Sequence, residues 1–535
     1  MARTTARPLA TREVRIDSER RPCEACGART RADWRSRRCV TTLAGCVGLS
    51  VQVRVCHRKG CLLEGMSLRA EEEGRWVLPE HEFGLDVLAF IGAQRYREHR
   101  SVPEIHALLR QRGVAISERT CTNLLDRYDE LVSLKLLDSG RLQETLQRQG
   151  RAVLAIDGLA PDVGHEVLWV VRECLSGQVL LARSLLSGSE QELAPLLEEV
   201  RLALGPVPIV GVVSDGQRSI RNALAHALPQ VPHQLCHFHY IREAARPLYE
   251  ADRHAKKELK KRVREVRKVE RAVEGRQDAG AHATRAYAAA VRSALTDDHR
   301  PPLQPSGLLL RRRLGAIEKS MERVFKRGAC PQELSRLHTV LRKALKATAR
   351  MWPGLARAYQ WIERTAVILR NEPGLDAAGV RRRLSALLAA LVRWTRRRHR
   401  GVLRQALAHF LLETRRYWKG LFHCYDVPDL PRTDNDLEHL FGTCRYHERR
   451  ASGRVRASAG LVVRGAVRLP AIASAFLLPA LDGPYLEPRN INDWQRLRFQ
   501  LEQRRVPRIL GRRFRANPDG YLRGIEEGLR PYLPA

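Results

Sequence analysis

The chain has 535 residues, and 94 Lys and Arg against 59 Asp and Glu give it a formal net charge of +35. This length predicts two to four domains, and so basic a balance argues against a typical small-molecule enzyme and favours a polyanionic partner. The charge is concentrated, because residues 251–400 carry 37 Lys and Arg but only 14 Asp and Glu. That asymmetry indicates a dedicated binding surface, although general heavy use of arginine is an alternative explanation.

The N-terminal region predicts neither export nor membrane insertion. Residues 1–7 lack the apolar core of a signal peptide. The longest apolar stretch, residues 469–481, contains Pro470 and Pro479 and is too short to span a bilayer. We therefore expect a cytoplasmic, nucleoid-associated protein without a membrane partner, whose residues 1–21 form a flexible basic arm.

Residues 22–75 contain two pairs of cysteines on either side of a β-like segment: Cys23 with Cys26, and Cys56 with Cys61. Four thiolates suit tetrahedral Zn²⁺, so the pattern predicts a structural zinc ribbon that helps to bind DNA. The second spacing is wider than usual, and His57 is an alternative ligand. Unrelated buried cysteines are the other interpretation.

Residues 80–140 read as three helices. Ser101 and Glu104 can form a capping box at the start of the second helix, which stops at Gly113, and Ser117 can cap the third. Two helices around a short turn predict a helix-turn-helix. The last helix would present to DNA the side chains of Arg119, Thr120, Asn123 and Arg127. A three-helix bundle that serves only for packing is the alternative.

Residues 150–240 alternate strand and helix signals. Five strands are expected at residues 153–157, 166–174, 178–185, 208–214 and 233–237, with a helix over 190–204. Three antiparallel strands followed by helix, strand, helix and strand is the order of an RNase H-like fold. Residues 241–430 are basic and helical in pattern, which makes them a large all-α insertion into that core.

Three acids occupy positions suited to holding metal ions. Asp157 closes an apolar run, Asp215 closes the fourth strand, and Glu438 lies beside the apolar stripe of a later helix. Carboxylates so arranged can hold two divalent ions, which clamp the attacking and leaving oxygens of a phosphoryl transfer. Asp434 and Asp436 are rivals to Glu438, but both fall at a helix start, where capping residues are expected.

This arrangement resembles the DDE transposases of the Mutator-like superfamily, including bacterial insertion-sequence transposases. The matching stretches are Ala155-Ile-Asp-Gly158, Val213-Ser-Asp-Gly216, Leu235-Cys-His-Phe-His239 and Asn435-Asp-Leu-Glu-His-Leu-Phe-Gly442. Cys236 and His239 match the family's Cys-x2-His element. This element could brace the sheet or lie near transferred DNA; a structural role is favoured over a zinc site, because no outside pair of ligands is evident.

The resemblance implies metal-dependent cleavage at transposon ends and transfer of 3′-hydroxyl ends into target DNA. Asp157, Asp215 and Glu438 would bind two Mg²⁺ ions, for which Mn²⁺ can substitute. The partners would be double-stranded DNA, at transposon ends and target, and further copies of the chain in a homodimer or higher oligomer. The densest basic clusters of the insertion would contact phosphates: Arg311, Arg312 and Arg313, then Arg396, Arg397 and Arg398.

The predicted protein is therefore multidomain α/β (α+β), an RNase H-like core interrupted by an all-α insertion and preceded by a zinc ribbon and a helix-turn-helix. Its segments are the arm (1–21), the ribbon (22–75), the helix-turn-helix (80–140), the core's first part (150–240), the insertion (241–430), the core's second part with Glu438 (431–483) and a basic helical tail (484–535). Two alternatives are a catalytically inactive transposase-derived regulator and a structure-specific RNase H-like nuclease.

Overall fold

The computed structural model describes residues 9–136, 138–160, 166–296, 303–398, 402–453, 459–479 and 481–532. The chain is a mixed α/β protein that divides into two compact units. The first unit holds residues 1–210, 219–230 and 435–535, and the second holds residues 211–218 and 231–434. Within the described ranges, no helix combines the length and the apolar character that a membrane span requires.

The first unit begins with a small twisted sheet. Its strands are β1 (Arg12–Ile16), β2 (Arg31–Thr42), β3 (Gly45–Val55) and β4 (Ser67–Leu68). The central strand β3 pairs in parallel with β1 and antiparallel with β2 and β4. The expectation of a flexible arm over residues 1–21 is therefore wrong for β1. Its five residues are too few and too arginine-rich to show a period, and only pairing with β3 and burial of Ile16 reveal the strand.

A group of helices follows: α1 (Glu73–Trp76), α2 (Leu85–Tyr96), α3 (Val102–Gln111), α4 (Glu118–Leu136) and α5 (Ser139–Gln149). The predicted capping box is present at α3, where the Ser101 amide donates a 2.6 Å hydrogen bond to Glu104 Oε2. The α3–α4 turn passes through Gly113, whose φ of 78° favours glycine. Ser117 Oγ then accepts a 3.1 Å hydrogen bond from the Thr120 amide and caps α4.

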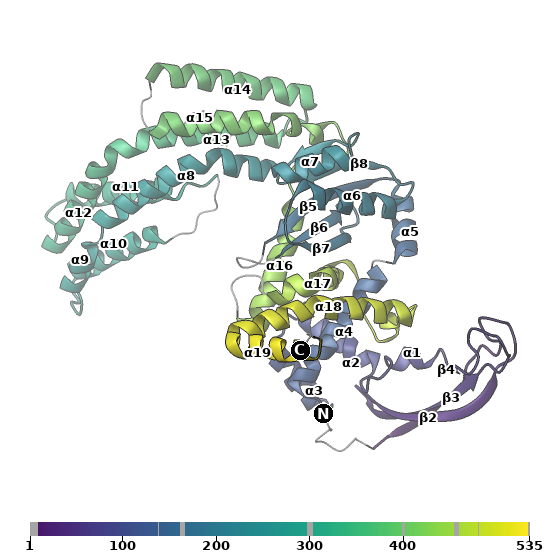
Figure 1. Ribbon diagram of the computed structural model, residues 1–535. Helices are drawn as coiled ribbons and strands as arrows, with labels where there is room; N and C mark the ends of the chain where they lie inside the picture. Colours follow the sequence, from purple (N-terminus) through teal and green to yellow (C-terminus); the bar gives the residue numbers. More distant parts are fainter. Residues whose placement is uncertain are drawn as a thin grey trace. The chain divides into compact units, whose positions relative to one another are not determined.

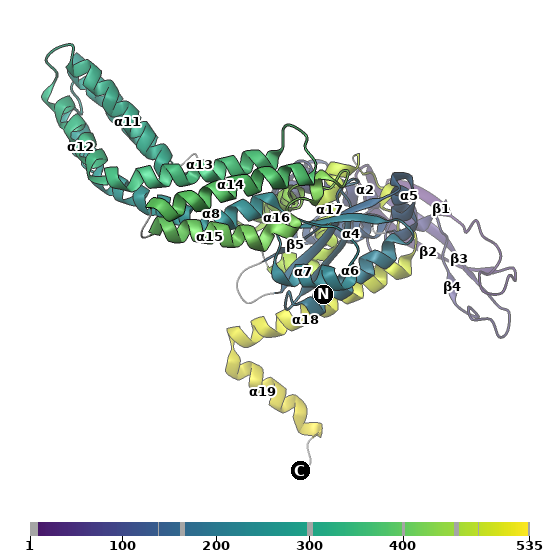
Figure 2. The same ribbon diagram turned by 90° about the horizontal axis from the view of Figure 1, so that it is seen from above.

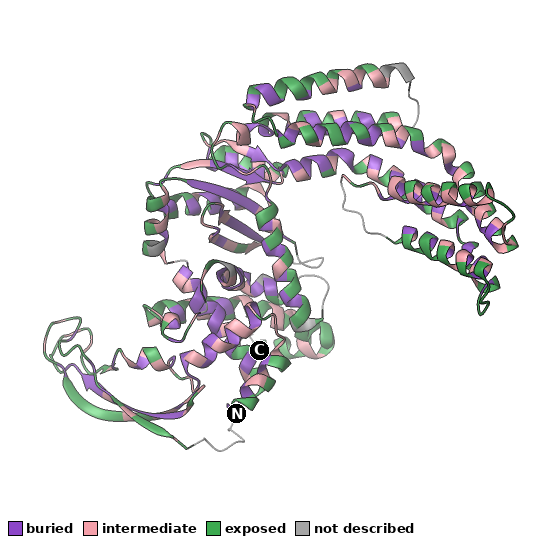
Figure 3. Ribbon diagram, turned by 180° about the vertical axis from the view of Figure 1, so that it is seen from behind, coloured by how far each residue is buried: buried purple, intermediate pink, exposed green. Residues whose placement is uncertain are grey.

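The central sheet has the strand order β7-β6-β5-β8-β9. Its strands are β5 (Ala152–Leu159), β6 (Val167–Glu173), β7 (Val179–Leu185), β8 (Ile209–Ser214) and β9 (His233–Leu235), with α6 (Glu190–Leu204) and α7 (Arg218–Ala227) between them. The first three strands are antiparallel, and β8 and β9 are parallel. The predicted RNase H-like order is thus confirmed. Residues 153–156 are buried, as expected of a central strand. The strands of this sheet are largely buried (Figure 3).

Four C-terminal helices complete the first unit: α16 (Asn435–Ser452), α17 (Ala459–Leu477), α18 (Ile491–Ala516) and α19 (Pro518–Leu529). α17 packs on β6 and β7, and α16 packs against β5 (Figure 1). The approach of α17 to β6 is close enough to require glycine, since a Cβ on Gly465 would lie 2.3 Å from Leu168 Cδ2. α18 packs on α4, where the Trp494 indole donates a 2.9 Å hydrogen bond to Glu130.

Beyond β9, the second unit is helical. Its main helices are α8 (His237–Arg262), α9 (Val266–Ala272), α10 (Ala279–Leu295), α11 (Ser306–Phe325), α12 (Gln332–Thr348), α13 (Trp352–Arg370), α14 (Ala377–Arg398) and α15 (Val402–Tyr417). The long helix α8 contributes to two apolar cores, with Tyr240 in one and Leu259 in the other. Figure 2 shows α8, α13, α14 and α15 running side by side. Described residues between 241 and 430 form no strand, as predicted for the insertion.

Candidate functional site

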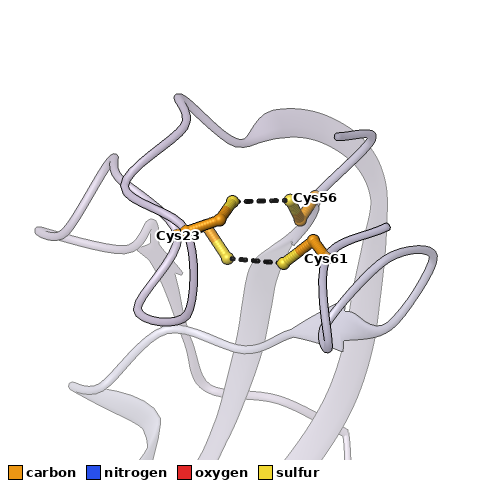
Figure 4. A group of neighbouring side chains, drawn as sticks. Cys23, Cys56 and Cys61 are labelled. Atoms are coloured by element: carbon orange, nitrogen blue, oxygen red, sulfur yellow. Dashed lines mark hydrogen bonds between the residues drawn. The ribbon is translucent and has the colours of Figure 1, made fainter. Parts of the chain in front are cut away.

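Four thiols lie together at one end of the N-terminal sheet. Cys23 and Cys26 come from the loop between β1 and β2, Cys56 directly follows β3, and Cys61 lies in the next loop. The Sγ atoms of Cys23 and Cys61 lie 3.7 Å apart (Figure 4). Those of Cys26 and Cys56 are also 3.7 Å apart. All four sulfurs lie within 4.8 Å of one another, which confirms the predicted grouping. His57, the alternative ligand, is exposed and lies outside this group.

These separations suit a tetrahedral metal. Thiolates bound at about 2.3 Å to one tetrahedral Zn²⁺ lie roughly 3.8 Å apart. The two 3.7 Å distances are close to that separation. The arrangement could hold one zinc ion.

Three of the residues predicted to face DNA from α4 are accessible. Arg119 and Asn123 are exposed, and Thr120 is partly exposed. All three lie in the first two turns of α4, directly after the turn that joins it to α3. This is the end of the second helix that contacts base edges in helix-turn-helix proteins.

Arg127 is a correction to the predicted DNA-facing set. Its side chain is buried, with 7% of the residue exposed, and its guanidinium lies 3.2 Å from the buried Glu130 carboxylate. Helical spacing placed Arg127 beside Asn123 on the exposed side, but the ion pair with Glu130 directs its side chain toward the interior of the first unit. Arg127 is therefore part of the packing between α4 and its neighbours.

Asp157 lies within β5, opposite Val170 of β6, and the strand continues two residues beyond it to Leu159. Its carboxylate is half-buried, and Oδ1 accepts a 2.7 Å hydrogen bond from the Gly158 amide. Gly158 leaves little room beside this acid, because a Cβ there would lie 2.9 Å from Val167. Asp157 thus projects from a fixed central strand.

Glu438 lies in the first turn of α16 and is half-buried. The predicted inward stripe is confirmed, since Leu437, Leu440, Phe441 and Cys444 are all buried. Glu438 borders this stripe and lines an open pocket of about 700 Å³ together with His99, His439 and Tyr446. Because α16 packs against β5, Glu438 and Asp157 belong to contacting elements of the first unit.

Asp215 belongs to the second unit and directly follows β8. Its Oδ1 accepts a 2.8 Å hydrogen bond from the Gln217 amide, and its backbone carbonyl accepts one from Tyr417. Burial raises the pKa of the Asp215 carboxyl above its usual value, and the Asp434 carboxylate adds to this rise. The Gln217 amide and the positive charge of Arg242 oppose it.

The Cys-x2-His element has a third member that the sequence did not indicate. Cys236, His239 and Asp434 are buried, and their ligand atoms lie within 4.8 Å of one another. Asp434 was expected to cap a helix, and it lies 195 positions after His239 in the sequence. Only the tertiary structure brings it to the first turn of α8.

The basic residues predicted to contact phosphates fall in the second unit. Arg311, Arg312 and Arg313 lie on α11, with Arg312 exposed and Arg311 over the Trp352 ring at 5.9 Å. Arg396, Arg397 and Arg398 end α14, and their side chains fall outside the described ones.

A more pronounced basic concavity was missed. It has a volume of about 1090 Å³ along α8, and its basic lining residues are Arg253, Lys256, Lys257, Lys260, Lys261 and Arg264. The sequence shows a run of closely spaced lysines and arginines here, but the predicted phosphate contacts were the clusters of three consecutive arginines.

Comparison with protein families finds no family model that matches the chain, and comparison with curated proteins finds no similar sequence. Among solved structures, the Drosophila P element transposase strand transfer complex is similar, with 12% sequence identity and a TM-score of 0.35. The match covers 73% of this chain and 91% of that one. A TM-score of this size does not establish a common fold.

Proposed function

We propose that this protein is a DDE transposase of the Mutator-like kind, which cleaves DNA at transposon ends and joins 3′-hydroxyl ends to target DNA. The observation that carries the proposal is the position of the three acids on the strand order. Asp157 lies on β5, Asp215 follows β8, the neighbour of β5 in that order, and Glu438 lies on α16, which packs against β5. An RNase H-like sheet with acids at these three places is suited to phosphoryl transfer.

Asp157, Asp215 and Glu438 would hold two Mg²⁺ ions, which polarise the scissile phosphate and acidify an attacking water or 3′-hydroxyl. The donor set fits, because hard divalent ions prefer carboxylate oxygens. Asp157 lies on the buried strand β5 and Asp215 directly follows the buried strand β8, so both backbones are held in place. Glu438 borders an open pocket, so a DNA strand could reach its carboxylate from solvent.

The remaining segments would bind double-stranded DNA. Zn²⁺ would stabilise the cysteine loops of the N-terminal sheet, and the start of α4 would contact bases and phosphates through Arg119, Thr120 and Asn123. The basic concavity of α8 and the arginines of α11 would follow the phosphate backbone of end or target DNA. Transposition of two ends would require a homodimer or a higher oligomer.

The test is strand cleavage and strand transfer in Mg²⁺, with the duplex DNA that flanks the protein's own gene. Asp157→Asn, Asp215→Asn and Glu438→Gln should each abolish both products while DNA binding persists. Asp436→Asn is the matched control, because Asp436 is an exposed acid on the same turn of α16. It should leave both products at the wild-type level.

The products also separate the alternatives. Cleavage without joining would indicate a nuclease, and binding without either product would indicate a regulator. Full activity of both Asp157→Asn and Glu438→Gln would overturn the assignment of the site.

A further inference from the structure

We propose that Cys236, His239 and Asp434 form a second zinc site, buried in the helical unit and separate from the four-cysteine cluster. The group combines a thiol, an imidazole and a carboxylate, the three side-chain types that bind Zn²⁺ in proteins. The proposal does not depend on catalytic activity and goes beyond the proposed function.

Two of the ligands are fixed by the start of α8. Cys236 is the residue before the helix, and its amide donates a 2.8 Å hydrogen bond to the Ser214 carbonyl at the end of β8. The Tyr240 amide in turn bonds to the Cys236 carbonyl at 3.0 Å, which closes the first helical turn. Residues three apart lie on the same side of a helix, so Cys236 and His239 face the same point.

The third ligand arrives on a segment that is anchored beside this turn. The His237 amide donates a 2.9 Å hydrogen bond to the Arg432 carbonyl, two residues before Asp434. On the other side of the turn, the His237 ring contacts the Leu421 carbonyl at 2.8 Å. These backbone contacts hold Asp434 against Cys236 and His239 from a distant part of the chain.

The interatomic distance fits shared coordination better than a direct hydrogen bond. His239 Nδ1 lies 3.4 Å from Asp434 Oδ1. Nitrogen and oxygen ligands at about 2.0 Å from a tetrahedral Zn²⁺ lie roughly 3.3 Å apart. The pair therefore has the separation of two corners of a zinc tetrahedron.

Burial gives the strongest argument for a cation. Asp434 is 1% exposed, and its carboxylate oxygens have no well-formed hydrogen bond; among the described residues they meet only the His239 ring, at 3.4 Å, and the Cys236 thiol. A buried carboxylate is costly unless it is paired or coordinates a metal. Zn²⁺ bound by the Cys236 thiolate, neutral His239 and the Asp434 carboxylate would supply the missing partner.

A thiol nucleophile is the other use of a Cys–His–Asp group. Such a cysteine must reach its substrate, but Cys236 is 0% exposed. Cys236 is therefore a candidate ligand and not a nucleophile, and with three protein ligands the fourth corner of a zinc tetrahedron would be filled by water. The site ties the end of β9 and the first turn of α8 to residues 432–434, close to Asp215, whose carboxylate interacts electrostatically with both His239 and Asp434.

The test is the zinc content of the full-length protein after gel filtration, measured by inductively coupled plasma mass spectrometry. Wild type should retain about two equivalents of zinc per chain, one per site. Cys236→Ser and Asp434→Asn should each lose about one equivalent, and Cys26→Ser combined with Cys56→Ser should lose the other. The Cys26→Ser/Cys56→Ser protein keeps the second site intact. It should bind one Co²⁺ and show the visible spectrum of a tetrahedral site that has one thiolate.

Two controls keep the result specific. Cys424→Ser removes another thiol of the same unit, and His338→Gln alters the more exposed Glu318–Glu322–His338 group. Both should leave the zinc content unchanged. If Cys236→Ser or Asp434→Asn fails to fold, the cobalt spectrum and zinc content of the Cys26→Ser/Cys56→Ser protein still show whether the second site binds metal. A protein with that double substitution that retains no metal would overturn the proposal, as would unchanged zinc in folded Cys236→Ser.

Discussion

The Tyr417 hydroxyl donates a 3.0 Å hydrogen bond to the backbone carbonyl of Asp215. Tyr417 is the last residue of α15 and is 7% exposed, so the bond is shielded from water. The backbone next to Asp215 is thereby fixed from a helix more than 200 residues away in the sequence. Tyr417 would position the acid without touching DNA.

We therefore expect Tyr417→Phe to slow strand cleavage about fivefold, because a net hydrogen bond contributes about 1 kcal/mol. The maximal rate should fall while the affinity for DNA stays the same. Tyr287→Phe is the matched control, since its hydroxyl bonds to Ser320 in another part of the same unit. An equal loss of rate in both variants would contradict a specific role for Tyr417.

Arg127 and Arg119 should behave in opposite ways although they lie on the same helix. Arg127→Ala leaves the buried Glu130 without one of its ion pairs, and we expect it to lower the free energy of unfolding by about 1–3 kcal/mol. Arg119→Ala should leave stability unchanged and weaken DNA binding. Thermal unfolding and a binding titration on both variants check this. Weaker binding by a fully stable Arg127→Ala would restore Arg127 to the DNA-contacting set.

His447 predicts a pH dependence of stability. It is 2% exposed, with the rings of Tyr96 and His99 against it. Burial lowers the pKa of His447 to about 3, and the charges of Arg95 and His99 add to this. The folded protein therefore keeps His447 neutral at pH values where the unfolded chain, with an ordinary pKa of about 6.5, takes up a proton. Stability is lost as the pH falls below about 6.5.

The expected size follows from that difference in proton uptake. Between pH 7.5 and 5.5, His447 should account for about 1.4 kcal/mol of the lost free energy of unfolding. Denaturant unfolding at both values should show a shallower loss for His447→Gln than for wild type. His226→Gln removes an exposed histidine of the same unit and should keep the wild-type slope. Identical slopes for all three proteins would exclude this account.

If the basic concavity of α8 binds DNA, it should contribute to the salt dependence of DNA affinity. Arg253, Lys257 and Lys261 are exposed and recur every four residues, so they form one ladder on the helix. If each contacts one phosphate, the triple change to Gln should reduce the slope of log affinity against log salt by about 2.7.

The control for the α8 ladder removes the same charge elsewhere. Arg148, Arg183 and Arg201 each already pair with a glutamate of the first unit. Their triple change to Gln should leave the slope unaltered. An equal reduction in both triple variants would mean that only net charge matters.

The sequence predicted the elements whose information is local. The bounds of α6 were predicted to the residue, and β5 to β9 lie within two residues of the predicted strands, although the fifth was expected to reach His237, which instead begins α8. The four-cysteine group was predicted because its ligands come in two short pairs. In each case the signal lies within a few neighbouring residues, which periodicity and spacing can read.

The features that the sequence did not predict correctly depend on contacts between residues far apart in the chain. Nothing near Asp434 in the sequence indicates that it meets His239, and helical spacing alone cannot show that Glu130 draws Arg127 inward. The strand β1 is defined by its pairing with β3, not by its own composition. Long-range contacts decide all three features.

The hydrogen bond from the His237 amide to the Arg432 carbonyl also has an architectural consequence. The first and last residues of the large helical segment are therefore in direct backbone contact. A module with adjoining ends can be lengthened or shortened at its far end at little cost in chain closure, because loop closure costs grow only slowly with length. A short turn joining residues 237 and 432 should therefore be able to close the chain in place of this module.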